Sequence, residues 1–142
     1  MNVKIIIGVV IALVVVGIAG SYFAEDVPHD VIRAEKPDLI VVDTPLPGER
    51  ISSPLTITGR ARGTWYFEAS FPVRLKDQNG NEIAVVPVQA QEEWMTTEFV
   101  PFRGVLTFTP PPSGTRGTLI FQKDNPSDLR ELDDSLEFPI VF

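Results

Sequence analysis

The alternation of side chains over residues 63–75 constrains the fold more than any other feature of this chain. Every second residue is apolar, and the residues between them include Tyr66, Glu68 and Arg74. A period of two sends the two sets to opposite faces of a β-strand. The pattern therefore predicts one half-buried strand over the whole segment. Its predicted inner face carries Trp65, Phe67, Ala69, Phe71, Val73 and Leu75.

The residues that follow this strand predict a hairpin. Asn79 and Gly80 form the kind of dipeptide that supplies positive φ angles in a tight turn. Asp77, Asn79 and Asn81 are also spaced like the start of a calcium loop. An EF-hand loop counted from Asp77 needs Gly at its sixth position and Glu at its twelfth, where this chain has Glu82 and Val88. Turn chemistry explains these residues without a metal ion.

Short strand patterns separated by Pro and Gly turns continue through the rest of the chain, and no amphipathic helix is found. The 13 Pro residues fit an all-β fold, because Pro breaks helices and protects strand edges. The spacing predicts an immunoglobulin-like β-sandwich of seven or eight strands over residues 38–142. Pro87 predicts that its strand lies at an edge or contains a bulge. The predicted strands are residues 39–42, 54–61, 63–75, 82–90, 104–109, 118–123 and 136–142.

The N-terminal region predicts a membrane anchor. Residues 5–24 contain no charge, and 20 residues of helix at about 1.5 Å each span roughly the 30 Å of a bilayer core. Lys4 precedes this run and Glu25 follows it, which favours a cytoplasmic N-terminus. We expect a transmembrane helix over residues 1–24, a linker over residues 25–37, and a single-pass protein of the cell membrane with its C-terminal domain extracytoplasmic. A cleaved signal peptide is the alternative, and it leaves the domain on the same side.

Composition excludes several classes of function. Residues 25–142 hold 19 acidic and 11 basic residues, a net charge of −8, so nucleic acid is not expected as a partner. The chain has no Cys, and its one His, His29, lies in the predicted linker. Neither a zinc site nor a Ser-His-Asp triad therefore has its parts in the domain. We expect no catalytic residues, no cofactor and no metal, and hence no enzyme.

Six segments in the second part of the chain form an ordered set, at residues 45–48, 53–61, 63–73, 94–96, 99–102 and 123–127. Together they resemble the bacterial spore germination immunoglobulin-like domain family. The resemblance implies a β-sandwich module of exported or membrane-attached bacterial proteins, often beside a germination and sporulation domain. This chain departs from that pattern, because the predicted anchor leads straight into the module. The resemblance brings no catalytic residues.

Trp94 and Met95 are the predicted binding residues. Trp94 follows two Glu residues and precedes Met95 in a loop-like context, and the two would form a contact surface if both are exposed. Trp65 lies in phase with the apolar set and is expected in the core. Glu68 is expected to form an ion pair with Arg60, Arg62 or Arg74. A catalytic carboxylate with a raised pKa is the alternative for Glu68. Residues 124–134 are expected to form a solvated acidic loop that includes a turn at 125–127.

These patterns predict a membrane-anchored extracytoplasmic immunoglobulin-like module without catalytic activity. It would mediate protein–protein interaction or assembly at the bacterial cell envelope, with a germination or sporulation role implied by the resemblance. The predicted partners are the membrane, through the N-terminal helix, and an envelope protein, which requires an exposed apolar patch or a free sheet edge. The alternative is a module that binds carbohydrate or peptidoglycan. That alternative requires Trp94 and a second aromatic residue exposed on one face.

Overall fold

The computed structural model describes residues 33–142, so the predicted transmembrane helix over 1–24 and most of the predicted linker lie outside the described residues. Within residues 33–142 there is no helix long and apolar enough to cross a membrane. Two single-turn 3-10 helices, η1 (Gly63–Trp65) and η2 (Arg130–Leu132), accompany eight strands. The strands are β1 (Glu35–Lys36), β2 (Ile40–Thr44), β3 (Leu55–Arg62), β4 (Ser70–Asp77), β5 (Glu82–Ala90), β6 (Phe99–Leu106), β7 (Arg116–Gln122) and β8 (Ser135–Val141). Glu35–Lys36, which fall within the predicted linker, thus pair with β2.

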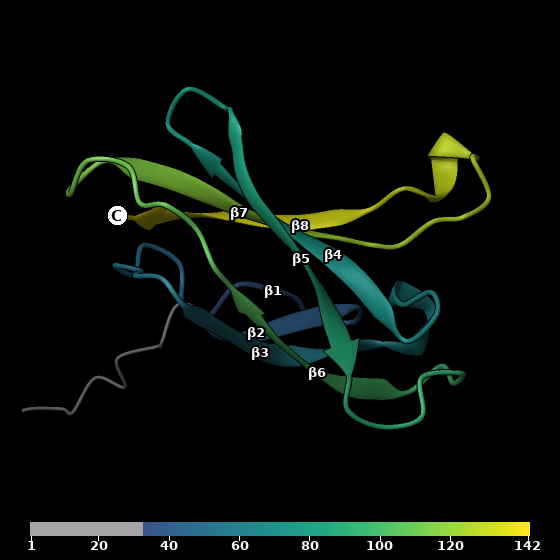
Figure 1. Ribbon diagram of the computed structural model, residues 1–142. Coiled ribbons are helices and arrows are strands. Elements are labelled where there is room, and N and C mark those ends of the chain that lie inside the picture. Colours follow the sequence, from purple (N-terminus) through teal and green to yellow (C-terminus); the bar gives the residue numbers. More distant parts are fainter. Residues whose placement is uncertain (1–32) are drawn as a thin grey trace, which may run out of the picture. The chain divides into compact units, whose positions relative to one another are not determined.

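The eight strands form one antiparallel sheet in the order β1-β2-β3-β6-β5-β4-β7-β8 that folds over into two layers. Figure 1 shows β1, β2, β3 and β6 in one layer and the other four strands above them. The layers are joined where Gln89 and Ala90 of β5 pair with β6. On the opposite side, Arg50 forms a parallel bridge with Val141, so the sheet is nearly closed. The predicted all-β fold with seven or eight strands is confirmed.

The core between the layers is a chain of aromatic rings. Phe71 and Phe102 are almost fully buried and meet edge to face, with ring centroids 5.0 Å apart. Trp65 and Tyr66 both pack against Phe71, at 6.4 Å and 5.2 Å. Edge-to-face pairs of this kind add about 1 kcal/mol each beyond the area they bury. The predicted core position of Trp65 is confirmed, since only 1% of the residue is exposed.

The prediction of one strand over residues 63–75 is wrong in its first half. Gly63–Trp65 form η1, and a tight turn follows before β4 begins at Ser70. Tyr66, predicted outside, is buried and donates its hydroxyl hydrogen bond to the Val100 carbonyl at 2.6 Å. Phe67, predicted inside, is exposed. The period of two fails here because the chain must cross from β3 in one layer to β4 in the other.

The predicted hairpin between β4 and β5 is confirmed, with one correction. Only Gly80 has a positive φ, of 82°, and Asn79 does not. The Asp77 carboxylate holds the turn instead, because its Oδ1 accepts hydrogen bonds from the backbone N–H groups of Asn79 and Asn81. The side-chain amide of Asn81, which donates to Asp77 Oδ2 at 3.0 Å, and these backbone bonds hold the pKa of Asp77 below its usual range. The predicted calcium-like residues therefore serve the turn.

Of the two alternatives predicted for the strand that contains Pro87, the bulge is found and the edge position is not, because β5 lies between β6 and β4 in the sheet order. Among the described residues, β5 pairs with β6 only through Gln89 and Ala90, and a register shift interrupts its pairing with β4 next to Lys76. Pro87 and this irregularity both hinder the addition of another strand.

One prediction of strand bounds is wrong, because β6 runs from Phe99 to Leu106 rather than over 104–109. Every residue of β6 has a partner in β3.

Candidate functional site

The connections between strands gather at two opposite ends of the sandwich. We call residues 37–39, 63–69, 91–98 and 123–134 the loop end, and residues 45–54, 78–81 and 107–115 the turn end. The three longer segments of the loop end lie together on the right in Figure 1. Backbone hydrogen bonds join them: Gly63 donates to Glu98 at 3.0 Å, and Asp124 donates to Trp65 at 3.0 Å. The loop end is therefore one continuous region.

The two predicted binding residues, Trp94 and Met95, lie at the loop end but differ in exposure. Trp94 is half-buried and packs against the core. Met95 is 73% exposed, the most exposed large apolar residue in the described part of the chain. The turn is tight because the Thr96 N–H donates to the Trp94 carbonyl at 2.8 Å. The structure thus places Met95 on the surface and Trp94 partly in the core.

Further apolar side chains are exposed at the loop end, and sequence reasoning missed them. Five of the seven exposed large hydrophobic residues between residues 33 and 142 lie there, and none lies at the turn end. The five are Leu39, Phe67, Met95, Leu129 and Leu132. Phe67 was missed because the strand pattern placed it inside. Leu129 and Leu132 carried a detectable pattern, since each stands beside acidic residues in a segment without a strand period.

Acidic side chains are concentrated at the same end. The loop end holds ten of the 16 acidic residues in 33–142 but only two of the 11 basic ones, a net charge of −8. The other described residues hold six acidic and nine basic side chains, a net charge of +3. Among the ten, only Glu98 and Asp134 form ion pairs within the described range, with Arg62 and Lys36. Most of this negative charge is therefore not neutralised by a neighbour.

The expected ion pair of Glu68 is not found in the structure. Arg60 pairs with Asp43, Arg62 with Glu98, and Arg74 with Glu82. Glu68 instead lies near Asp124, whose pKa is raised by burial and, to a smaller extent, by the charge of Glu68. The correction has a simple cause: Glu68 lies on the turn before β4 rather than on the strand, so it does not face the strand arginines. Neither Glu68 nor Asp124 lines the two grooves described below.

Locally unfavourable features also gather at the loop end. Three non-glycine residues of the described chain have positive φ angles, Glu68, Ala69 and Asp128, and all three lie there. Left-handed backbone costs about 1–2 kcal/mol for a residue with a side chain. The one buried side-chain polar atom without a hydrogen-bond partner in the described region is Trp65 Nε1, also at this end. Strained and unsatisfied groups cluster at functional sites more often than elsewhere.

The segment at 125–127 forms the predicted turn within the loop end. The Asn125 Oδ1 accepts hydrogen bonds from the Ser127 backbone N–H at 3.2 Å and from its hydroxyl at 2.5 Å. The Asn125 amide also donates to the Asp133 carboxylate at 2.8 Å and to the Leu129 carbonyl at 2.9 Å. Asn125 thus ties together both sides of the acidic loop. In residues 33–142 no group of three or more His, Asp or Glu residues is placed to hold a metal ion.

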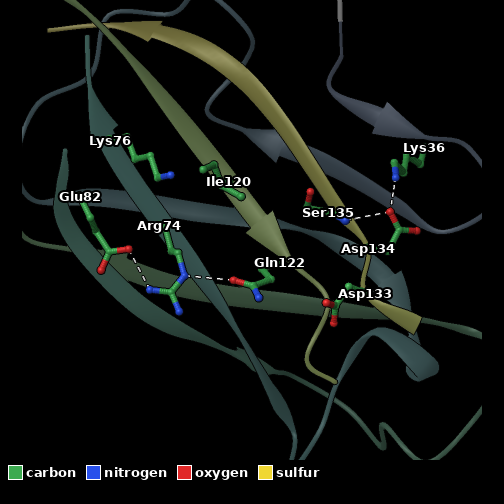
Figure 2. Close-up of a pocket in the computed structure, with 9 residues that line it drawn as sticks. All are labelled: Lys36, Arg74, Lys76, Glu82, Ile120, Gln122, Asp133, Asp134 and Ser135. Atoms are coloured by element: carbon green, nitrogen blue, oxygen red, sulfur yellow. Dashed lines mark hydrogen bonds and ion pairs between the residues drawn. The ribbon is translucent and has the colours of Figure 1, made fainter. Parts of the chain in front are cut away.

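A groove of about 640 Å³ on the outer face of β4, β7 and β8 is the second candidate surface. Figure 2 shows Ile120 of β7 between Arg74 and Lys76 of β4 on one side and Ser135 on the other. Arg74 donates to Glu82 at 2.8 Å and to Gln122 at 3.0 Å, and Lys36 pairs with Asp134. The charged residues in the lining are three cations and three anions, and most are already paired. The groove therefore shows no charge preference for a ligand.

A second groove of about 520 Å³ continues toward the turn end and shares Lys76 and Ile120 with the first. Neither lining includes an aromatic residue, although aromatic faces are what a sugar ring would stack on. The grooves offer hydrogen bonds without a stacking platform. Of the surfaces in the described domain, the loop end is the one that combines exposed apolar side chains with excess charge.

The fold defines a small immunoglobulin-like β-sandwich domain whose loop end carries exposed apolar and acidic side chains. The chain belongs to the family of immunoglobulin-like domains of bacterial spore germination, whose family model matches residues 39–129. The match covers β2 to β7 and ends inside the loop that leads to β8. No curated protein and no solved structure matches the chain.

Proposed function

We propose that this protein is a non-catalytic protein-binding module of the bacterial cell envelope, anchored in the membrane by residues 5–24, and that its loop end is the binding surface. The observation that carries the proposal is the gathering of exposed apolar side chains at one end, with Met95 the most exposed. Loops held by a rigid sandwich are the usual place for recognition residues. Large exposed apolar side chains at such a place favour contact with another protein.

The direction of the chain supports this arrangement. β1 is antiparallel to β2, and β2 is antiparallel to β3, so β1 and β3 run in the same direction. β3 ends at Arg62, next to the loop end, and β1 therefore also runs toward that end. Arg33, which precedes β1 and pairs with Asp43, lies farther from the loop end than Lys36 does. Residues 33–36 therefore approach the loop end from the side of the turn end.

The alternative, a module that binds carbohydrate or peptidoglycan, has less support. It requires an aromatic platform, and Trp94 is half-buried against the core. Phe67 is the one exposed aromatic side chain among the large exposed hydrophobic residues at the loop end. Retention of the full chain on purified cell wall, lost on Phe67→Ala but not on Met95→Ala, would favour the glycan alternative over our proposal.

Site-specific photo-crosslinking in living bacteria tests the proposal. A photoreactive amino acid replaces Met95 at the loop end or, as the matched control, Gln78 in the exposed hairpin of the turn end. We expect a discrete protein adduct from position 95 and none from position 78. We also expect Leu129→Asp to reduce the adduct at position 95, because it places a charge in the apolar surface. Equal adducts from both positions, or none from position 95, would contradict the proposal.

A further inference from the structure

Each segment of the loop end carries an exposed apolar side chain within two residues of an acidic one. Leu39 follows Asp38, Phe67 precedes Glu68, and Met95 lies two residues after Glu93. Leu129 and Leu132 lie between Asp128, Glu131 and Asp133 in the longest loop. The same pairing of an exposed apolar side chain with nearby carboxylates thus occurs on all four segments.

This pairing leads to an inference that rests on the proposed function and names the chemistry of the partner. We propose that the loop end docks a basic segment of a partner protein in which Lys or Arg residues alternate with apolar ones. Its cations would meet the carboxylates that lack an ion pair in the described domain, and its apolar side chains would meet Met95 and Leu129. Complementary charge increases the rate and specificity of such docking, while apolar contact supplies most of the affinity.

Charge also excludes the other occupants of this surface. A second copy of the chain that docked symmetrically would bring two loop ends together, each with a net charge of −8. An anionic lipid surface or a nucleic acid would be repelled for the same reason. A neutral glycan would leave the carboxylates without any counter-charge. A basic protein segment is the occupant that satisfies both the apolar and the acidic groups.

Two synthetic amphipathic peptides with the same Leu face test the inference. One carries Lys on its polar face and the other carries Glu. Binding to the full chain is measured in a non-ionic detergent, with micelles alone as the blank. We expect the Lys peptide to bind at least about tenfold more tightly than the Glu peptide. We also expect its affinity to fall about fivefold or more between low and high salt, because salt screens exposed charges beyond about 10 Å at 0.1 M.

Matched charge-reversal variants locate the site. Glu92→Lys with Glu131→Lys changes the loop end, and Glu35→Lys with Glu137→Lys makes the same change in net charge elsewhere; all four side chains are exposed. We expect about a tenfold loss of Lys-peptide affinity in the first pair and less than a twofold loss in the second. Equal affinity for both peptides, or equal loss in both variants, would overturn the inference. A protein adduct at position 95 whose crosslinked segment is acidic would overturn it too, while the proposed function would stand.

Discussion

Both ends of this sandwich reverse the chain between strands, but different residue types have the positive φ angles at the two ends. At the turn end each positive φ angle belongs to a glycine, at Gly48, Gly80 and Gly114. At the loop end the positive φ angles belong to Glu68, Ala69 and Asp128. Glycine adopts this backbone without steric cost, whereas other residues do not. The turn end therefore avoids backbone strain. The loop end has strained non-glycine residues at positions where glycine would be more stable.

The same contrast holds for charge and exposure. The loops of the turn end contain one acidic and one basic residue, Glu49 and Arg50, and six of the 13 Pro residues. The loop end has a net charge of −8 and five exposed large hydrophobic residues. Departures from local rules that persist in a folded protein point to function. The difference between the ends is the main reason to place recognition at the loop end.

Of the substitutions that test this comparison, Gly63→Ala is expected to lower the free energy of unfolding most. A Cβ at this position would lie 1.9 Å from the Thr96 carbonyl oxygen and 2.3 Å from that of Trp94. Both atoms are backbone, so the loop of residues 91–98 must move away from η1. We expect the free energy of unfolding to fall by about 3 kcal/mol. Chemical denaturation of the full chain, followed by the fluorescence of its two Trp residues, measures the change. A loss below about 1 kcal/mol would show that the segments of the loop end are not tightly joined.

A smaller effect is expected from glycine substitutions at the turn end. A Cβ added at Gly80 or Gly114 meets nothing within 4 Å, so the cost is the backbone conformation alone. We expect Gly80→Ala and Gly114→Ala each to lower the free energy of unfolding by about 1 kcal/mol. Denaturation under the same conditions checks this. Unchanged stability in both variants would remove the contrast in backbone strain between the ends.

The reverse substitution at the loop end is expected to stabilise the protein. Ala69 has a φ of 64°, and glycine there removes steric strain while adding conformational freedom to the unfolded chain. The difference should leave Ala69→Gly more stable by about 0.5 kcal/mol. Thermal denaturation of this variant and of the wild type gives the sign. A destabilised Ala69→Gly would mean that the methyl group itself contributes packing at this end.

The two ends should also respond oppositely to acid. Asp77, the last residue of β4 beside the turn end, has a lowered pKa, so its stabilising effect is present above the unfolded pKa and is lost as the pH falls through the folded value. Asp124 at the loop end has a raised pKa, so its ionised form costs stability above the folded value and that cost disappears on acidification. We expect Asp77→Asn to destabilise the protein at neutral pH and not in acid. Asp124→Asn should stabilise it at neutral pH only. The free energy of unfolding of each variant, measured from neutral to acidic pH, tests both expectations. The same pH dependence in both variants would contradict the opposite pKa shifts of Asp77 and Asp124.

The strands that alternate in the usual way could be predicted from the sequence. The second half of the opening segment, where Phe71, Val73 and Leu75 are buried, forms β4 as expected. The first half could not be predicted, because the crossing between layers at residues 63–69 depends on where the loop with Trp94 packs. The short β1 was missed because its two residues form a strand only against β2. Local pattern contains no information of that kind.

The candidate site was predictable in part for a similar reason. The loop context around residues 92–97 drew attention to Met95, which the structure places on the surface, but the half-burial of Trp94 follows from packing beyond the local sequence. The concentration of charge was visible in the segment 124–134. That four separate segments bring their acidic and apolar residues to one end follows only from the topology. Residues that are far apart in the sequence thus form one surface at the loop end.

The most direct test of the central claim adds the same charge at each end of the domain. The protein captured by crosslinking at position 95 is purified, and its affinity is measured for the full chain carrying Met95→Asp or Gln78→Asp. Both positions are exposed, so neither variant should change the free energy of unfolding by more than about 0.5 kcal/mol. We predict at least about a tenfold loss of affinity for Met95→Asp and no loss for Gln78→Asp. Equal affinities for the two variants would contradict the assignment of the loop end as the binding surface.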